Sequence, residues 1–401
     1  MELVGKVNNY DWGKLGTQSE AAKLAALNSA DFNADENVPY SELWMGDHPS
    51  GPSVIKSSKE ELGKFIAKNN GTGIIGGLDK LPFLFKVLSI RKALSIQVHP
   101  NKKEAERLFV ERPEVFKDPN HKPEIAIALT PFVALCGFRT NEDIQELCQK
   151  LPPLEELLGS ENVKLLQSGS KGLRTCFESL MNSPVDRTNA CIEAIANNYT
   201  SVLQERGMLD MFNKIKKDFP GDSGLLALFF VNLIRLQPGE AIFLAANEIH
   251  AYLEGDCIEC MSCSDNVVRA GLTPKLKDIP CLIQMLNFEG SPPEKNLFKP
   301  IKVDECLERF APPIEDFAVD KLSIPKSEKE YKLKAEKYGG ILLVLNGERQ
   351  LVFANGDELA VTRGSIVFIP GNVGDSLTLK VKEGNGSDFQ GYIAKYNSYL
   401  N

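Results

Sequence analysis

The first part of the chain combines one short helical pattern with several strand patterns. Apolar spacing over 19–27 predicts a helix, whereas the apolar run over 81–90 is typical of a buried strand. We expect 93–99 to be the hairpin partner of that strand and 124–129 to form another strand. Asn101 has the position and residue type of a helix N-cap, so a helix is expected directly after the second strand.

Helical spacing dominates the middle of the chain. From residue 141 to about residue 222, apolar residues recur in short helical patterns separated by Pro and Gly. The apolar segment 225–236 is compatible with a helix or a strand. The Pro-rich and charged segment 291–320 suits a linker or an extended crossing. Further strands are expected at 241–244, at 250–253 and from residue 322 to the C-terminus.

One sequence pattern occurs twice. Gly239, Ile242, Phe243 and Asn247 recur 125 positions later as Gly364, Val367, Phe368 and Asn372, and His250 then falls opposite Asp375. A glycine turn, a strand and a following histidine are typical of the second ligand strand of a cupin barrel. The repeat therefore predicts two cupin barrels, of which only the first keeps the ligand. Coincidence between two hairpins is the alternative.

These patterns predict a fold that is mainly β with an α-helical insert: two cupin-like (jelly-roll) barrels plus a helical domain. The expected divisions are 1–140 for the first part of a catalytic cupin domain, 141–224 for the helical insert, 225–290 for the second part of the catalytic domain, and 291–401 for a degenerate C-terminal cupin-like domain with its linker.

Composition narrows the class of protein. The 401 residues carry a formal net charge of −8 and no basic run, which argues against a nucleic-acid partner. No apolar stretch reaches the roughly 20 residues of a membrane span, and the N-terminal residues lack the features of a signal peptide. Nine cysteines without a disulfide pattern favour reduced thiols. We therefore expect a cytoplasmic protein with no membrane or nucleic-acid partner.

Three predicted strands carry polar side chains on one face and apolar side chains on the other. Because strand side chains alternate, each polar set shares a face. The sets are Ser95, Gln97 and His99; Lys122 and Glu124; and His250 and Tyr252. This pattern is expected of a barrel with a functional interior.

Two of the four histidines lie on these polar faces. A single histidine of this kind is usually a hydrogen-bonded structural residue. Gln97, His99, Glu124 and His250 together are different, because unpaired buried polar groups cost roughly 1–3 kcal/mol each and one metal ion satisfies them all. Imidazole and carboxylate ligands suit zinc, so we predict one Zn²⁺ per chain.

Cys257, Cys260 and Cys263 offer a competing metal site because they are spaced by two residues. A second paired knuckle is missing, and residues three apart on a strand point to opposite faces. We therefore expect free thiols in a barrel wall. Shortly afterwards, Arg269 and Lys275 could bind a phosphate, the alternative being a solvated loop with a salt bridge.

Several motifs resemble type I phosphomannose isomerases, in order and over nearly the whole chain. They include Asn9-Tyr10-Asp11-Trp12-Gly13, His121-Lys122-Pro123-Glu124 and the segments 39–46, 94–102, 250–253 and 255–275. The last segment is the most specific. One departure is Ile249, where a proline before the ligand histidine is common in the family.

The resemblance implies zinc at Gln97, His99, Glu124 and His250, and a cupin catalytic domain with a helical insert. It implies Trp12, Glu42, Ser95, Lys122 and Tyr252 as substrate-binding residues, and Arg269, Glu259 and Lys275 as catalytic residues. The implied reaction interconverts mannose 6-phosphate and fructose 6-phosphate and supplies mannose for GDP-mannose and glycan synthesis. The expected partner is a small sugar phosphate, and we expect a monomer.

Aldose–ketose exchange moves a proton between two carbons through a cis-enediolate. Zinc would act as a Lewis acid, and Arg269 would add positive charge. Glu259 is the preferred carbon base, while Lys275, Lys122 and His121 stay open. Two other classes are a cupin dioxygenase, which generally uses three histidines and one glutamate, and a sugar-binding cupin without catalysis. Gln97 argues against the first, and the retained Arg269, Lys275 and Glu259 argue against the second.

Overall fold

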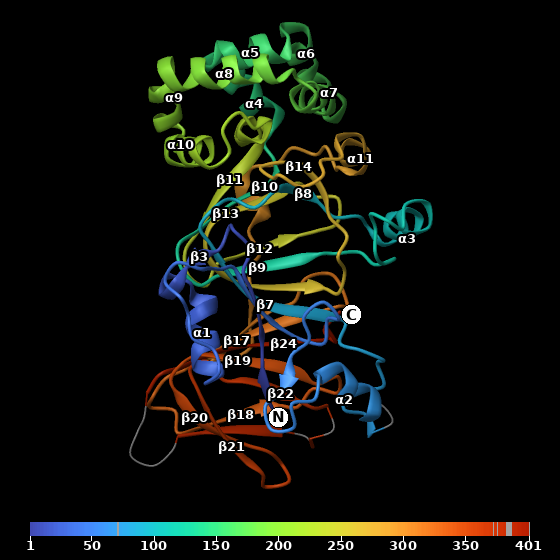
Figure 1. The fold of residues 1–401 in the computed structure, drawn as a ribbon, viewed down its shortest axis with the longest axis vertical. Coiled ribbons are helices and arrows are strands. Elements are labelled where there is room, and N and C mark those ends of the chain that lie inside the picture. The colour runs from blue at the N-terminus through green and yellow to red at the C-terminus, as the bar shows by residue number, and fades with distance from the viewer. Residues whose placement is uncertain (70–71, 372, 375, 382–386, 401) are drawn as a thin grey trace.

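The computed structural model describes residues 1–69, 72–371, 373–374, 376–381 and 387–400. Helix and strand contribute about 30% and 31%, so the chain is mixed α and β rather than mainly β. The molecule is elongated, with helices at one end, strands in the middle and the C-terminal strands at the other end (Figure 1). Among the described residues, no helix combines the length and apolar character needed to span a membrane.

The central sheet has ten strands. They are β2 (Lys6–Asn8), β5 (Glu42–Met45), β7 (Phe83–Ile90), β8 (Ile96–Val98), β9 (Glu124–Ala128), β10 (Phe132–Phe138), β11 (Val231–Leu236), β12 (Ala241–Leu244), β13 (His250–Ser262) and β14 (Val268–Gly271). A separate pair joins β3 (Lys14–Leu15) to β4 (Pro39–Tyr40). The predicted strands at 81–90, 124–129 and 241–244 are thus confirmed to within a few residues. The strand predicted at 250–253 is confirmed at its start but continues to Ser262.

The thirteen-residue strand β13 organises this sheet. Its first residues pair with β8 and β10, and its remaining residues pair with β7 and β9. Gly255 lies between these two parts with a φ of 112°, and a Cβ there would meet the Pro131 carbonyl oxygen at 2.6 Å. Only glycine suits this position, because both the backbone conformation and the close approach exclude a side chain.

The predicted hairpin between 81–90 and 93–99 is wrong. β7 pairs with β5 and β13, whereas β8 pairs with β13 and β14. The connection does not close a hairpin because the amides of Arg91 and Lys92 donate to the carbonyl of Trp12, and the amide of Leu94 donates to that of Tyr252. β7 and β8 therefore follow one another along β13.

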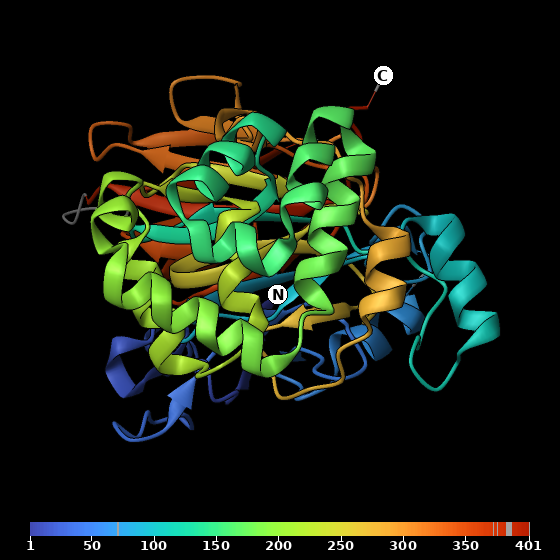
Figure 2. The same cartoon turned by 90° about the horizontal axis from the view of Figure 1, so that it is seen from above.

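Helices cover one end of the central sheet (Figures 1 and 2). They are α4 (Asn141–Lys150), α5 (Pro152–Leu158), α6 (Ser160–Lys164), α7 (Ser170–Met181), α8 (Val185–Asn198), α9 (Thr200–Glu205) and α10 (Leu209–Asp218). The helical expectation for this segment is confirmed. α7 buries Leu173, Phe177 and Leu180 at helical spacing, and the Phe177 ring packs against Phe138 of β10 at 5.1 Å. The segment 225–236 divides into a 3₁₀ turn (Ser223–Phe229) and β11.

The remaining helices lie outside this segment. They are α1 (Glu20–Asn28), α2 (Leu62–Asn69), α3 (Lys102–Glu111) and α11 (Ile279–Met285), with 3₁₀ turns at Gly16–Gln18, Leu165–Ser168 and Pro293–Asn296. Asn101 caps α3 as predicted. Its side chain accepts from the Glu104 amide at 2.9 Å, and the Glu104 carboxylate accepts from the Asn101 amide at 3.4 Å.

Two further sheets contain the C-terminal strands. An eight-stranded sheet is formed by β15 (Ile301–Lys302), β16 (Leu307–Phe310), β17 (Ala318–Ile324), β24 (Phe389–Lys395), β19 (Gly340–Asn346), β22 (Ile366–Ile369), β1 (Glu2–Val4) and β6 (Val54–Ile55). A four-stranded sheet is formed by β18 (Glu330–Lys334), β23 (Ser376–Lys380), β20 (Glu348–Val352) and β21 (Glu358–Thr362). The N-terminal strand β1 pairs with β22, so the two ends of the chain share a sheet.

The segment expected as a linker and the repeated sequence pattern both contain strands. The segment 291–320 is not only a linker, because β15 and β16 pair with each other and β16 pairs with β17. The internal repeat coincides with real strands: β12 and β22 have the same length, and Gly239 and Gly364 before them both have positive φ, 92° and 88°. Asn372 and Asp375 lie outside the described residues.

Candidate metal centre and active site

Three strands bring the proposed metal ligands together. On β13, His250 is the register partner of Gln97 on β8. Glu124, the first residue of β9, is the partner of Met261 near the other end of β13. His99 directly follows β8, so residues that are far apart in the sequence converge inside the sheet.

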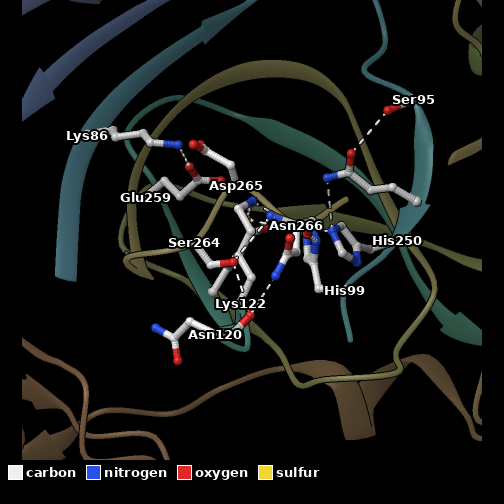
Figure 3. Close-up of polar contacts among 12 residues, drawn as sticks. Lys86, Ser95, His99, Asn120, Lys122, His250, Glu259, Ser264, Asp265 and Asn266 are labelled. Atoms are coloured by element: carbon white, nitrogen blue, oxygen red, sulfur yellow. Dashed lines mark hydrogen bonds and ion pairs between the residues drawn. The ribbon is translucent and has the colours of Figure 1, made fainter. Parts of the chain in front are cut away.

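The two histidines, labelled in Figure 3, form a compact buried group with the glutamate. One potential ligand atom of each of His99, Glu124 and His250 lies within 4.8 Å of the others. Nε2 of His99 is 3.4 Å from Oε1 of Glu124, and Nε2 of His250 is 3.6 Å from Oε2. Each side chain is about 1% exposed, so water does not solvate this charge. Among the described residues, this is the one such group of three.

Backbone carbonyls set the orientation of both rings. Nδ1 of His99 lies 2.8 Å from the carbonyl oxygen of Asn266, and Nδ1 of His250 lies 3.0 Å from that of Glu248. A carbonyl only accepts, so Nδ1 carries the proton in each ring and donates it. The lone pair of each Nε2 then faces the Glu124 carboxylate, which also accepts. Several acceptors directed at one point are what a cation requires.

The ionisation of the group is that of a metal site. Burial, together with the other ring, lowers the pKa of His250 to about 3. Burial and the Lys122 ammonium also lower the pKa of His99, so both imidazoles are neutral at neutral pH. Burial opposes ionisation of Glu124, but Lys122 and His99 outweigh it and hold the pKa of this carboxyl well below its ordinary range. Neutral imidazoles beside a carboxylate are the ligand forms that metals bind.

Gln97 and Lys122 complete the surroundings of the group. Nε2 of Gln97 is 3.2 Å from Nε2 of His250, and its Oε1 accepts from Ser95 Oγ at 3.0 Å. Lys122 contacts Glu124 Oε1 and lies 3.5 Å from Nε2 of His99. Oε2 of Glu124 has no hydrogen-bond partner among the described residues. A cation bound there would satisfy this buried oxygen, so the donor set fits a metal.

A second buried network contains Glu259 and a residue that the sequence analysis missed (Figure 3). Nζ of Lys86 lies 2.8 Å from Oε2 of Glu259 and 3.9 Å from Oε1 of Glu42. Glu42 also accepts from the indole of Trp44 at 2.9 Å. The available signal was that Lys86 is the one charged residue inside the apolar run that forms β7.

The charges in this network depend on one another. Burial raises the pKa of Glu259, while Lys86 opposes the rise. Burial alone would lower the pKa of Lys86, but Glu259 and Glu42 more than offset it and place the pKa above its ordinary value. One cation thus lies between two buried carboxyls, and the raised pKa of Glu259 suits a group that exchanges protons.

Arg269 is an unpaired cation close to the metal ligands. It lies on β14 as the register partner of Gln97 and is partly buried. Its guanidinium has no hydrogen-bond or ion-pair partner in the part of the chain that the structure describes, and burial lowers its pKa. An unpaired, partly buried guanidinium is suited to binding an anion.

The predicted site residues Tyr252, Trp12 and Lys275 differ in how deeply they are buried. Tyr252 is fully buried, its hydroxyl has no partner among the described residues, and burial raises its pKa well above the ordinary value. Trp12 packs against the cluster that contains Tyr252. The exposed Lys275 holds its ammonium 5.5 Å from the centre of the Tyr10 ring.

Two alternatives lose support from the geometry. His121, one of the possible bases, lies with Nε2 3.0 Å from an Asp316 carboxylate oxygen. The cysteines at 257, 260 and 263 are free thiols; the first two are buried, and burial raises their pKa values well above the ordinary value. None of them belongs to the converging group described above.

The fold and site define a metal-binding protein with an enclosed His-Glu-His centre and charged groups beside it. Residues 1–141 match the family described as phosphomannose isomerase type I, catalytic domain. The mannose-6-phosphate isomerase of Mus musculus is 42% identical, and that of Homo sapiens is 41% identical, each over 94% of both chains.

Solved structures agree with the sequence relatives. A variant of phosphomannose isomerase from Salmonella typhimurium superimposes with a TM-score of 0.84 at 31% identity, covering 99% of this chain and 98% of that one. A zinc-bound mannose 6-phosphate isomerase gives a TM-score of 0.84 at 33% identity, covering 99% and 98%. The chain therefore belongs to the type I phosphomannose isomerase family, and the resemblance seen in the sequence is confirmed.

Proposed function

We propose that the chain is a zinc-dependent aldose–ketose isomerase that interconverts mannose 6-phosphate and fructose 6-phosphate. The observation that carries the proposal is the buried His99, Glu124 and His250 group, whose ligand atoms lie within 4.8 Å of one another in a chain of this family. Zinc is the cofactor, one per chain, in keeping with the zinc-bound relative.

The assay that tests this proposal follows conversion of mannose 6-phosphate before and after treatment with a chelator, and again after zinc is added back. We expect activity to disappear with the metal and to return with zinc, because the buried acceptors require a cation. Full activity after verified removal of zinc would contradict the metal role. Absence of activity on this substrate with zinc bound would contradict the proposed reaction.

Gln97 is proposed as the fourth ligand. Its amide already contacts His250, and a half-turn of the amide would bring its oxygen to the position that its nitrogen occupies. Ser95 Oγ now donates to the amide oxygen of Gln97, and after the half-turn it could accept from the amide nitrogen instead. A neutral amide oxygen completes two imidazoles and one carboxylate without adding charge.

Zinc, when bound, supplies Lewis-acid stabilisation of the negative charge that develops on the sugar oxygens during enolisation. The side chains of the chain supply binding and proton transfer. We propose Glu259 as the carbon base, because its raised pKa lets it accept and return a proton near neutral pH. Arg269 adds positive charge to the developing enediolate from a position beside Gln97.

The phosphate and the sugar hydroxyls need further groups. We propose that Ser95, Lys122 and Lys275 contribute to binding, with Lys122 and Lys275 offering positive charge at the buried and exposed ends of the site. Trp12, Glu42 and Tyr252 are proposed to line the sugar site, and the unpaired Tyr252 hydroxyl has a free donor and acceptor for it.

Proton transfer predicts an isotope result. In deuterated water, the sugar formed by the enzyme is expected to carry deuterium at C1 or C2, because a proton held by Glu259 exchanges with solvent before it is returned. Mass spectrometry of the product would measure the label. A product without deuterium at every extent of conversion would favour direct hydride shift or complete internal return.

Lys86 is expected to set the pH range of the reaction. Replacing it with methionine removes the cation that opposes protonation of Glu259, so the pKa of Glu259 should rise further. The acid limb of the pH profile of kcat/KM should then move to higher pH by about 1–3 units. The Lys86→Arg variant, which keeps the charge, is the control. An acid limb that stays in place in Lys86→Met would show that Glu259 is not the titrating base.

We also propose the finer architecture predicted from the sequence. The ten-stranded sheet would form a cupin-like barrel, and the eight- and four-stranded sheets would form a second. The equal lengths of β12 and β22 support this proposal. The proposed divisions stay at 1–140, 141–224, 225–290 and 291–401, except that β1 and β6 pair with the C-terminal strands.

The proposed setting follows from the proposed reaction. The chain would act as a monomer in the cytoplasm and supply mannose for GDP-mannose and glycan synthesis. Oligomeric state can be measured by sedimentation of the zinc-loaded protein.

A further inference from the structure

A cavity lies among the C-terminal strands, and the proposed metal ligands are not part of its lining. It encloses about 240 Å³ and is lined by residues of the eight-stranded and four-stranded sheets. None of its lining residues belongs to the strands that carry the metal ligands. A cavity of this size is small beside the roughly 300–1,000 Å³ of ordinary ligand pockets, so it suits only a small molecule.

Part of the cavity lining is a network of charged side chains. Arg309 donates to both carboxylate oxygens of Asp320, at 2.7 and 2.9 Å. The Lys395 ammonium donates to Asp320 at 2.5 Å, to Glu336 at 2.8 Å and to the Tyr399 hydroxyl at 2.9 Å. Asp320 and Lys395 are each only 2% exposed. Two cations therefore balance two carboxylates in a largely buried setting.

The charge balance argues against a charged ligand. Three of the charged lining residues, Asp304, Lys332 and Lys334, are exposed to water. At the less exposed positions an anion would meet Asp320 and Glu336, and a cation would meet Arg309 and Lys395, so neither finds a net opposite charge there. This arrangement differs from that of Arg269, which has no carboxylate partner among the described residues. The cavity is therefore suited to an uncharged molecule.

The unused hydrogen-bonding capacity indicates the kind of molecule. Within the described part of the chain, Nη1 of Arg309 and Oε2 of Glu336 have no hydrogen-bond partner, although both residues line the cavity. One of these groups only donates and the other only accepts. Hydroxyl groups can satisfy both because each hydroxyl donates and accepts without adding charge. A phosphate would add negative charge beside the Glu336 carboxylate, and an ammonium would add positive charge beside the Arg309 guanidinium.

Part of the lining is apolar. It is made by the side chains of Leu307, Leu333, Ile369, Leu377 and Ile393. Leu307 and Ile393 lie two residues from Arg309 and Lys395 on the same strands, so apolar and charged side chains are neighbours. Tyr331 adds an aromatic ring whose hydroxyl donates to Asp304 at 2.7 Å. A molecule that fits this mixed lining must combine several hydroxyl groups with a C–H surface, as a sugar ring or a sugar alcohol does.

We propose that this cavity binds an uncharged polyhydroxy molecule of monosaccharide size, through Arg309 and Glu336 and through the leucine and isoleucine side chains of its lining. The proposal does not depend on the isomerase reaction, because the site shares no residue with the metal centre. Its occupant would be a second ligand of the protein and would carry no phosphate.

D-Mannitol and inorganic phosphate are the probes that separate the possible ligands. The zinc-loaded full chain, labelled at leucine and isoleucine methyl groups, is titrated with each probe and followed by NMR. We expect mannitol to shift the methyl signals of Leu333, Ile369 and Leu377 in a saturable way, and phosphate to leave them in place. The same result is expected in the His250→Ala variant, which shows that the response does not come from the metal centre. No saturable shift with mannitol, or a shift with phosphate instead, would overturn the proposal.

Two variants test the contacts. Glu336→Gln removes the free acceptor charge while keeping the shape of the side chain, and we expect mannitol affinity to fall about 10- to 100-fold. Glu308→Gln is the matched control, because Glu308 pairs with Lys321 and does not line the cavity. If Glu336→Gln fails to fold, Leu377→Phe fills the cavity and should abolish the shifts. Unchanged affinity in a folded variant of either kind would overturn the proposal.

Discussion

Replacing His250 with alanine is expected to remove zinc and to lower kcat/KM by roughly three orders of magnitude or more. The side chain is about 1% exposed, and its Nε2 faces the Glu124 carboxylate at 3.6 Å. Without the imidazole, Glu124 and His99 lose one of the three groups that converge on the metal. Zinc content by atomic absorption and turnover of mannose 6-phosphate measure the two losses.

The control for this experiment is the wild-type chain freed of zinc by a chelator. Both preparations should have the same low activity, but only the wild type should recover when zinc is added. Circular dichroism would show whether the variant keeps its fold. A folded His250→Ala variant that retains zinc and turnover would show that the ligand assignment is wrong.

Replacing Arg269 with alanine should lower kcat by about 100- to 1,000-fold while leaving zinc bound. Its guanidinium is partly buried beside Gln97 and has no partner among the described residues, so its positive charge is available to the substrate. Because the residue is not a metal ligand, metal content should not change. Steady-state kinetics and zinc analysis on the same preparation would separate this variant from His250→Ala.

Lys277→Ala is a suitable control for the loss of a nearby cation. Lys277 lies on the same segment but is paired with Asp222 at 2.7 Å on the surface, and we expect its loss to change kcat by less than about twofold. A second variant, Arg269→Lys, keeps the charge but loses the bidentate geometry and should recover only part of the activity. Wild-type kcat in Arg269→Ala would contradict the proposed role.

Local alternation predicted much of the candidate site. It placed Gln97 and His99 on the polar face of one strand, and Glu124 and His250 on the polar faces of two others. The structure brings His99, Glu124 and His250 together. This worked because the period of a strand depends only on neighbouring residues. The same reasoning could not show which strands pair, and the hairpin expected between β7 and β8 is absent because β13 pairs with both.

The residues that were missed depend on tertiary contacts. Lys86 lies inside an apolar run, and its importance appears only once β13 places Glu259 opposite it at 2.8 Å. The N-terminal strand β1 likewise pairs with β22, more than 360 positions later, as the register of Leu3 with Ile366 shows. No local pattern contains such long-range pairing, because it is fixed by the packing of the whole sheet.

The continuous strand β13 carries both His250 of the candidate metal centre and Glu259, the proposed base. His250 at its start and Met261 near its end both lie against Glu124, so the strand curves back toward its own beginning. Gly255, with a φ of 112°, lies between them, and a Cβ there would meet the Pro131 carbonyl oxygen. Any side chain at this position would therefore be expected to change the separation between His250, the proposed metal ligand, and Glu259, the proposed base.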